Sequence, residues 1–255
     1  MSYEQLRSYL GGPFAEVEGW CIQHLWLAIE PLADAIKANG DPGPIGEIGV
    51  FHGKFFIGLV HTMGASEGNT AIDVFDMQEF NLDGAGKGNQ EIFGANLEKC
   101  GIPRSAVDMR AADSMGLTAD DASELRKRTG GGFSLFSVDG CHTVEHTMND
   151  LGFALEVTRR DGIIFVDDYY NANWPGVQEG VAKLYHNQAP RFVPLVYTSN
   201  KLFLCNLSFH ERYIEAIRAH LKAHHPEARY RDHRRYGYRC LSLFPERGAP
   251  SLSAV

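Results

Sequence analysis

The chain has 255 residues and a mass of 28.3 kDa, which is enough for one large α/β domain with a full core. Its 44% hydrophobic and 22% charged residues are ordinary for a soluble globular protein, and no apolar run reaches the roughly 20 residues of a membrane span. A formal net charge of -8 argues against broad affinity for nucleic acids. The N-terminus shows no secretory signal. We therefore expect a cytoplasmic protein with small-molecule partners, and neither nucleic acid nor membrane as a partner.

The cysteines give no sign of a zinc or redox site. They are five in number, widely separated and without a C-x-x-C pair: Cys21, Cys100, Cys141, Cys205 and Cys240. Such a pattern predicts reduced and mostly buried thiols.

The first forty residues contain an apolar, aromatic-rich segment. Between Trp20 and Ala38 apolar residues recur at helical spacing, which predicts a helix with a kink or a break at Pro31. The sequence DPGP at 41–44 then interrupts the chain, and from Ile45 strand-like and helix-like segments alternate. This alternation is typical of parallel βαβ units.

Most of the chain after Ile45 follows this alternation. The runs predicted as parallel strands are Ile45–Gly49, Ala71–Phe75, Val107–Ala111, Phe133–Val138 and Ile163–Val166. The predicted helices are Lys54–Met63, Asn89–Cys100, Ala119–Arg128, Thr143–Arg159, Val177–His186 and Phe209–Lys222. The last predicted strands are Phe192–Tyr197, Leu202–Leu207 and Tyr238–Phe244. Only four residues separate the first two of these three strands, so they must pair as an antiparallel hairpin.

These elements predict a Rossmann-like, doubly wound α/β sheet. It should be mostly parallel, with one antiparallel strand from the C-terminal hairpin and helices on both faces. We expect a single domain over 1–255, with an N-terminal helical substrate or lid segment (1–43), a cofactor-binding core (44–207) and a C-terminal helix and strand (208–255). Ligands of such sheets bind beyond the carboxyl ends of the strands, so the residues just after each strand are the functional candidates.

The first predicted strand ends in the turn EIGVFHG, which opens onto a helix. Gly49 and Gly53 would let the backbone turn tightly and approach a ligand closely. The turn is not the G-x-G-x-x-G of dinucleotide sites, and the acidic Glu47 beside it suits a cationic ligand group better than a phosphate. Taken alone, the motif could equally be a turn that only joins strand to helix.

Polar residues also follow the second and third strands. An acidic side chain at the end of the second strand can bond both hydroxyls of a ribose, and between Asp73 and Asp76 we choose Asp76. Asp113 and Ser114 follow the third strand, where an adenine ring would end. Asp-Ser pairs in loops, however, often only cap the next helix.

The strongest signal follows the fourth and fifth strands, which run into Asp139-Gly140-Cys141-His142 and Asp167-Asp168. If these strands are neighbours, three carboxylates converge, and their repulsion would raise their pKa values unless a cation neutralises them. All-oxygen ligands suit a hard divalent ion such as Mg²⁺, so Asp139, Asp167 and Asp168 are the predicted metal ligands. Each aspartate taken separately could simply cap a helix.

From Ile45 to about Leu184 the chain resembles the class I S-adenosylmethionine-dependent methyltransferases. The resemblance is carried by EIGVFHG, VDGCHTVEHTMNDL and DGIIFVDDYYNANWPGV, and it points to the branch with the macrocin-type sugar O-methyltransferases and, more distantly, catechol O-methyltransferase. It implies the following cofactor and metal residues: Glu47, Gly49 and Gly53 around the methionine part, Asp76 on the ribose, and Asp139, Asp167 and Asp168 on the metal. His142 falls where relatives place a catalytic base.

The resemblance implies methyl transfer to a hydroxyl of a small molecule, such as a sugar or a glycosylated natural product. A metal on that hydroxyl lowers its pKa and holds it beside the methyl group, and His142 accepts the proton. Asp139 is expected to be a catalytic and cofactor-binding residue as well as a metal ligand. His146 is the competing base. Asn171, Asn173 and Trp174 could line the acceptor pocket, although Trp174-Pro175 could also start a helix.

Other segments suggest ligands at first sight. Residues 84–88 look like a phosphate-binding loop, but Asn81 and Gly88 occupy positions where a glycine and a hydroxyl residue are needed, so a mobile loop over the cofactor is the better interpretation. The Arg- and Tyr-rich stretch 229–236 resembles nucleic-acid surfaces. Given the net charge, we expect a solvated edge or an anion contact for a nucleotide-linked substrate. His24 and Trp26 could cover the site, but such a Trp is usually core.

Three alternatives remain open from the sequence. A non-catalytic S-adenosylmethionine-binding or interaction protein would keep the glycine turn but would not need three aspartates and His142. A metal-dependent hydrolase would leave the glycine turn and Asp76 unexplained, and the third alternative is a methyltransferase that needs no metal. The sequence does not identify the acceptor or the number of subunits, and a homo-oligomer is compatible with it.

Overall fold

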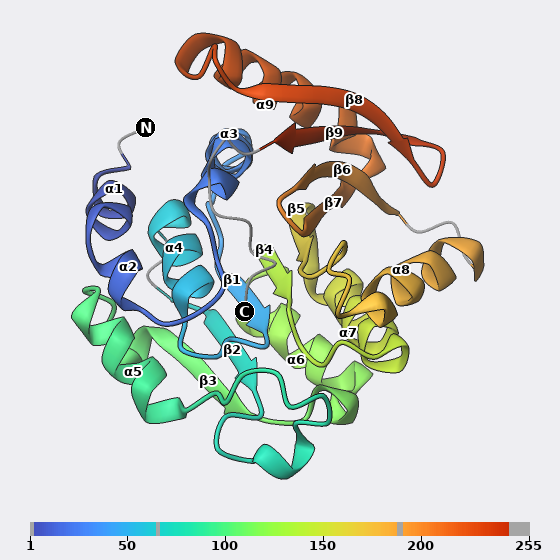
Figure 1. The fold of residues 1–255 in the computed structure, drawn as a ribbon. Coiled ribbons are helices and arrows are strands. Elements are labelled where there is room, and N and C mark those ends of the chain that lie inside the picture. Colours follow the sequence, from blue (N-terminus) through green and yellow to red (C-terminus); the bar gives the residue numbers. More distant parts are fainter. Residues whose placement is uncertain (1–2, 65–66, 188–190, 245–255) are drawn as a thin grey trace.

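A computed structural model of the chain describes residues 3–64, 67–187 and 191–244 (Figure 1). Its strands form one sheet in the order β3-β2-β1-β4-β5-β7-β6-β9-β8. The predicted fold class, an α/β sheet that is mostly parallel and carries helices, is confirmed. The end of the predicted C-terminal segment, 245–255, lies outside the described residues.

The strands occupy the sheet as two series. The first five are β1 (Ile45–Ile48), β2 (Asn69–Asp73), β3 (Val107–Ala111), β4 (Phe133–Val138) and β5 (Thr158–Val166), and their mutual pairings are all parallel. The others are β6 (Phe192–Thr198), β7 (Lys201–Asn206), β8 (Arg229–Arg235) and β9 (Tyr238–Phe244). β7 lies antiparallel between β5 and β6, β9 is parallel to β6, and β8 is antiparallel to β9. Two strands, rather than the expected one, therefore run against the rest.

Helices pack on both faces of the sheet and enclose two apolar cores (Figure 1). One face is covered by α1 (Glu4–Gly11), α2 (Pro13–Glu16), α3 (Trp26–Lys37), α4 (Lys54–Met63), α5 (Gln90–Lys99) and α9 (His210–His224). The other is covered by α6 (Ala119–Arg128), α7 (Val144–Val157) and α8 (Pro175–Asn187). α3 runs through Pro31 as one helix, so a break at that residue was not found.

The N-terminal Trp26 has a structural role. Trp26 is buried, and its indole nitrogen donates to Thr62 Oγ1 at 2.9 Å, so it belongs to the core rather than to a cover over a site. Among the helices that the structure describes, none has the length and apolar character needed to cross a membrane.

The sheet order reverses beside β1, which pairs with β2 on one side and β4 on the other. After β1 the chain moves outward through β2 and β3, and it then returns to place β4 and β5 on the opposite side. The connections on the two sides diverge at this point and leave a crevice at the carboxyl ends of β1 and β4.

Candidate active site

A cavity of about 330 Å³ occupies this crevice. Its walls include Gly49 after β1, Asp73 at the end of β2, Asp139 after β4 and Asp167 after β5. Several residues of the 80–88 loop close one side. The topology therefore places a ligand-sized space where the sequence predicted one.

Gly49 is required by the contact between the turns after β1 and β4. Its φ is +80°, and a Cβ there would lie 1.8 Å from the carbonyl oxygen of Asp139. Gly53 also has a positive φ, of +91°, but a Cβ on it would meet the Phe93 ring at 2.6 Å. Gly49 lines the cavity, whereas Gly53 is needed for packing and is not among the described lining residues.

Glu47 lies inside the protein rather than among the described residues that line the cavity. Only 2% of it is exposed, and within the described chain its Oε2 atom has no hydrogen-bond partner. Burial raises the pKa of Glu47 to about 8, against the opposing effects of the Lys201 charge and a hydrogen bond to Ser137. Glu47, which was predicted to surround the cofactor, is therefore not one of the described residues that line the cavity.

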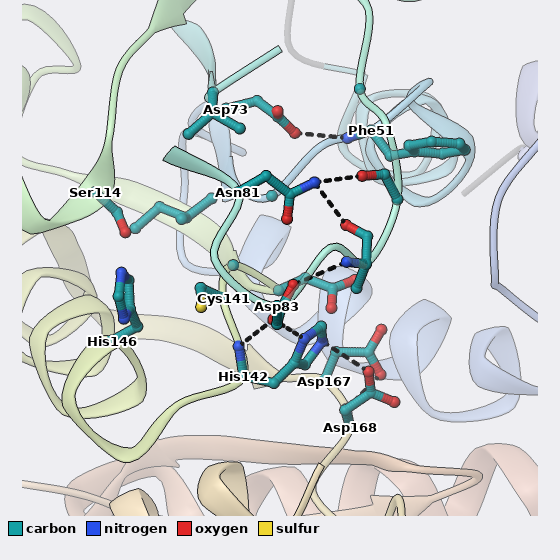
Figure 2. A pocket seen from close by; sticks show the side chains of 18 of the residues that line it. Phe51, Asp73, Asn81, Asp83, Ser114, Cys141, His142, His146, Asp167 and Asp168 are labelled. Carbon is teal, nitrogen blue, oxygen red and sulfur yellow. Dashed lines mark hydrogen bonds and ion pairs between the residues drawn. The ribbon is translucent and has the colours of Figure 1, made fainter. Parts of the chain in front are cut away.

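The expectation that Asp76 rather than Asp73 faces the site is wrong. Asp73 lines the cavity, and its carboxylate accepts from the backbone nitrogen of Phe51 at 2.8 Å (Figure 2). It also accepts from the backbone nitrogen of Phe75 at 2.6 Å. Asp76 is exposed and accepts from Asn89 Nδ2 at 2.5 Å, just before α5. The cause is the strand end: β2 stops at Asp73, two residues before the predicted end.

Asp113 and Ser114 both line the cavity after β3. Asp113 also accepts from Met115 N at 3.0 Å and so caps the short 3-10 helix Ser114–Gly116. Ser114 is buried, and Asn149 of α7 donates to its carbonyl oxygen at 2.7 Å. The capping role and a position in the cavity wall therefore coexist.

The acidic residues after β4 and β5 do converge, because the two strands are neighbours with Val138 opposite Val166. The atoms of Asp139, His142 and Asp168 that could bind a metal all lie within 4.8 Å of one another. Asp167 differs from the prediction: its Oδ2 pairs with Lys201, and its Oδ1 accepts from Asp168 N at 2.8 Å. The structure thus groups His142, rather than Asp167, with Asp139 and Asp168.

Lys201 is a buried cation at this cluster that the sequence reasoning missed. It is 2% exposed, and besides Asp167 its Nζ lies 3.7 Å from Asp139 Oδ2 and 4.4 Å from the centre of the Phe55 ring. Burial alone would lower the pKa of Lys201, but Asp167 and Asp139 outweigh burial and raise it. The group is therefore a permanent ammonium within an acidic cluster.

His142 is held on both sides by carboxylates. Its Nδ1 lies 2.7 Å from Asp83 Oδ2, and its Nε2 lies 2.9 Å from Asp168 Oδ2 (Figure 2). Its ring stacks on that of Trp174. Burial would lower the pKa of His142, but hydrogen bonds to Asp168 and Asp83 and nearby negative charge raise it to about 10. In this arrangement the ring has no nitrogen ready to accept a proton, in contrast to the predicted role of a base.

The competing base, His146, also lines the cavity but lies apart from Asp167 and Asp168 (Figure 2). Its Nδ1 is 2.7 Å from Thr143 Oγ1, at the start of α7. Neither carboxylate of the β5 end approaches it in Figure 2. His142 is therefore the histidine that belongs to the acidic cluster.

The predicted acceptor residues are in place around the cavity. Asn171, Asn173 and Trp174 line it, together with Trp20, which is 55% exposed. Trp174 thus lines the cavity and also precedes Pro175, the first residue of α8. The 84–88 stretch contributes three lining residues, which agrees with a loop over the cavity.

Comparisons with known proteins agree with this geometry. Residues 47–169 match the model of a family described as a methyltransferase domain. Among solved structures, the O-methyltransferase NovP aligns with a TM-score of 0.55 at 13% identity, over 72% of this chain and 79% of that chain. Cofactor-bound Rv0187 from MTB aligns with a TM-score of 0.52 at 16% identity, over 79% and 88% of the two chains.

A further solved structure is the MycE methyltransferase from the mycinamycin biosynthetic pathway, in complex with Mg and SAH. It aligns with a TM-score of 0.51 at 15% identity, over 81% of this chain but 54% of that chain. A search of curated proteins gave no match. At these identities the structural neighbours show the fold, and the family match confirms the resemblance inferred from the motifs.

Proposed function

We propose that this chain, whose residues 47–169 match a methyltransferase domain, is an S-adenosylmethionine-dependent O-methyltransferase assisted by a divalent metal ion. The acceptor is a hydroxyl of a small molecule, a sugar or a glycosylated natural product. One observation carries the proposal. The cavity at the reversal of the strand order also contains the Asp139, His142 and Asp168 cluster.

The cavity suits the cofactor. Gly49 places no side chain in the cavity wall beside Asp139. Asp113 and Ser114 offer polar groups to the cofactor at the end of β3. Each carboxylate oxygen of Asp73 accepts one backbone N–H, which leaves each a second lone pair for a ribose hydroxyl. Asp73 therefore takes the ribose role that the sequence assigned to Asp76.

The donor set suits a hard divalent cation. The carboxylates of Asp139 and Asp168 are oxygen ligands of the kind that Mg²⁺ prefers, and His142 lies beside them as the proposed proton acceptor rather than as a ligand. Within the part of the chain that the structure describes, Lys201 and His142 are the only cationic partners of four carboxylates at the site, those of Asp83, Asp139, Asp167 and Asp168. Burial and the charge of Asp167 raise the pKa of Asp139, as expected where negative charge is in excess. When bound, such an ion would lower the pKa of the acceptor hydroxyl.

The side chains supply orientation and a proton acceptor. Trp20 and Trp174 offer apolar surface, and Asn171 and Asn173 offer hydrogen bonds, so a polyhydroxylated acceptor can be held with one oxygen toward the cluster. His142 Nε2 is the proposed proton acceptor. It takes this role only after Nε2 has released its own proton and has exchanged its contact with Asp168 for one with the acceptor hydroxyl.

Lys201 supports a second candidate, a methyltransferase that needs no metal. Its ammonium already neutralises Asp167 and lies 3.7 Å from Asp139 Oδ2. A fixed cation can stabilise an oxyanion without a metal ion. The two candidates differ in how activity responds to chelation.

The test combines binding and transfer. We expect S-adenosylhomocysteine to bind in titration calorimetry, and labelled methyl transfer to hydroxylated sugars to cease with EDTA and to return with Mg²⁺. Asp168→Asn should lower transfer by about a hundredfold or more, whereas the exposed control Asp120→Asn should not.

Transfer that survives EDTA would favour the metal-free candidate. Cofactor binding without transfer to any acceptor would favour a binding protein, and the absence of cofactor binding would remove the whole proposal.

A further inference from the structure

The loop between β2 and α5 contains an aspartate that contacts the proposed proton acceptor twice. Asp83 Oδ2 accepts from the backbone nitrogen of His142 at 2.8 Å and lies 2.7 Å from the ring Nδ1 (Figure 2). The Asp83 side chain is only 10% exposed. One oxygen atom therefore fixes both the main chain and the ring of His142.

The loop itself is folded so as to present this aspartate. The other oxygen of Asp83 accepts from Ala85 N at 2.9 Å. Asn81 Nδ2 donates to Gly86 O at 2.7 Å and to Gln78 Oε1 at 2.9 Å. These bonds close the loop on itself, so the carboxylate of Asp83 is oriented before His142 meets it.

The remaining surfaces of the His142 ring are also constrained. Its face lies 4.4 Å from the Trp174 ring at an angle of 15°, and its Nε2 points to Asp168. Rotation of the ring by 180° would break the contact between Nδ1 and Asp83. Removal of Asp83 would therefore leave the stack but free the ring to turn within it.

We propose that Asp83 is a positioning residue for His142: by holding Nδ1, it keeps Nε2 directed at Asp139 and Asp168. This inference rests on the proposed function of the site. A carboxylate that accepts the Nδ1 proton of a histidine fixes its tautomer and leaves Nε2 as the working atom. Because Asp83 follows β2 and His142 follows β4, the contact also joins the cofactor side of the cavity to the reacting side.

The kinetic test compares Asp83→Ala, Asp83→Asn and a control on the same loop, the exposed Glu79→Gln. We expect Asp83→Ala to lower kcat by about 10- to 100-fold, with the acceptor KM and the Kd for S-adenosylhomocysteine nearly unchanged. Asp83→Asn should recover part of kcat, because its amide oxygen can still accept both contacts. An unchanged kcat in Asp83→Ala, or a loss explained by weaker cofactor binding alone, would overturn the proposal.

A second readout does not depend on activity. In Mg²⁺-containing samples with ¹⁵N-labelled histidine, the His142 ring signals, assigned with His142→Gln, should shift or broaden in Asp83→Ala and stay unchanged in Glu79→Gln. Identical signals in wild type and Asp83→Ala would contradict the positioning role. If the wild type transfers no methyl group to any acceptor, the proposed function fails, yet these signals still decide whether Asp83 orients the ring.

Discussion

At the scale of single residues, the missing side chain of Gly49 lets the turn after β1 pack closely against the turn after β4. We expect Gly49→Ala to weaken binding of S-adenosylhomocysteine at least about tenfold and to destabilise the fold by more than the roughly 1–2 kcal/mol of left-handed strain, because its Cβ would collide with the backbone of Asp139. Urea unfolding and titration calorimetry measure the two effects.

Gly64 provides the matched control for Gly49. Its φ is +70°, and a Cβ there meets no described atom within 4 Å. Gly64→Ala should therefore show the cost of the backbone strain alone and leave cofactor binding unchanged. Equal losses in the two variants would mean that strain, and not the contact with Asp139, makes Gly49 necessary.

Glu47 makes stability depend on pH at the same end of β1. The pKa of Glu47 in the folded protein is about 8, against 4.5 for an ordinary glutamate, so the folded state binds this proton more tightly than the unfolded state does. The wild type should therefore lose stability as the pH rises from about 4.5 to 8. Glu47→Gln has no proton to lose, so its melting temperature relative to wild type should be higher at pH 8.5 than at pH 5.

The expected difference for Glu47→Gln is on the order of 1 kcal/mol or more. Glu79→Gln, on the exposed loop, should show no such change between the two pH values. A pH-independent difference between Glu47→Gln and wild type would show that Glu47 does not carry the proton.

At the scale of elements, the β6–β7 hairpin supplies the cation of the site. Lys201→Met would leave Asp167 buried beside Asp139 without its partner, and we expect a loss of about 3–5 kcal/mol in the free energy of unfolding. The double variant Lys201→Met with Asp167→Asn should recover part of this loss, as measured by urea denaturation.

The control for the hairpin lysine is Lys99→Met. Lys99 is 51% exposed and pairs with Glu16 at the surface, so its loss should cost about 1 kcal/mol or less. If the double variant proves as unstable as Lys201→Met alone, the unpaired charge of Asp167 is not the reason for the loss.

The bounds of several elements could be predicted from the sequence alone. β3, β4, β9, α4 and α6 begin and end where the sequence predicted. β5 starts at Thr158, five residues earlier than expected. Its first half contains Arg159, Arg160 and Asp161, and these charged residues do not form the apolar run by which the strand was predicted. β8 was not predicted as a strand, since RYRDHRR offers no apolar alternation. It is the polar edge of the sheet, in agreement with a solvated edge.

Some residues of the candidate site could also be predicted from the sequence, and others could not. Residues directly after strands, such as Asp139 and Asp168, could be predicted because the topology alone brings strand ends together. Asp83 and Lys201 could not, because their partners lie 59 and 34 positions away and a loop fold and a hairpin register determine the contacts. Asp76 was chosen in error because the end of β2 was placed two residues too late.

In the molecule as a whole, two apolar cores lie under the helices, and a charged strand forms one edge of the sheet. Both faces of the sheet are covered by helices (Figure 1). The outermost strand, β8, is exposed along nearly its whole length. Its arginines place like charges along a strand edge that would otherwise pair with another chain. The basic stretch thus has a structural explanation that does not involve nucleic acid.

The antiparallel pairing of β7 with β5 determines which face of the sheet the Lys201 side chain occupies. Lys201 starts a strand whose side chains alternate between the two faces, with Leu202 opposite Val166. One inserted residue that slips this pairing would move the ammonium to the opposite face and leave the aspartates to repel one another. The turn joining β6 to β7 is therefore restricted in length, and its Asn200 is restricted in identity because its Nδ2 donates to Asp168 Oδ1. Both restrictions lie outside the 47–169 segment that matches the family model.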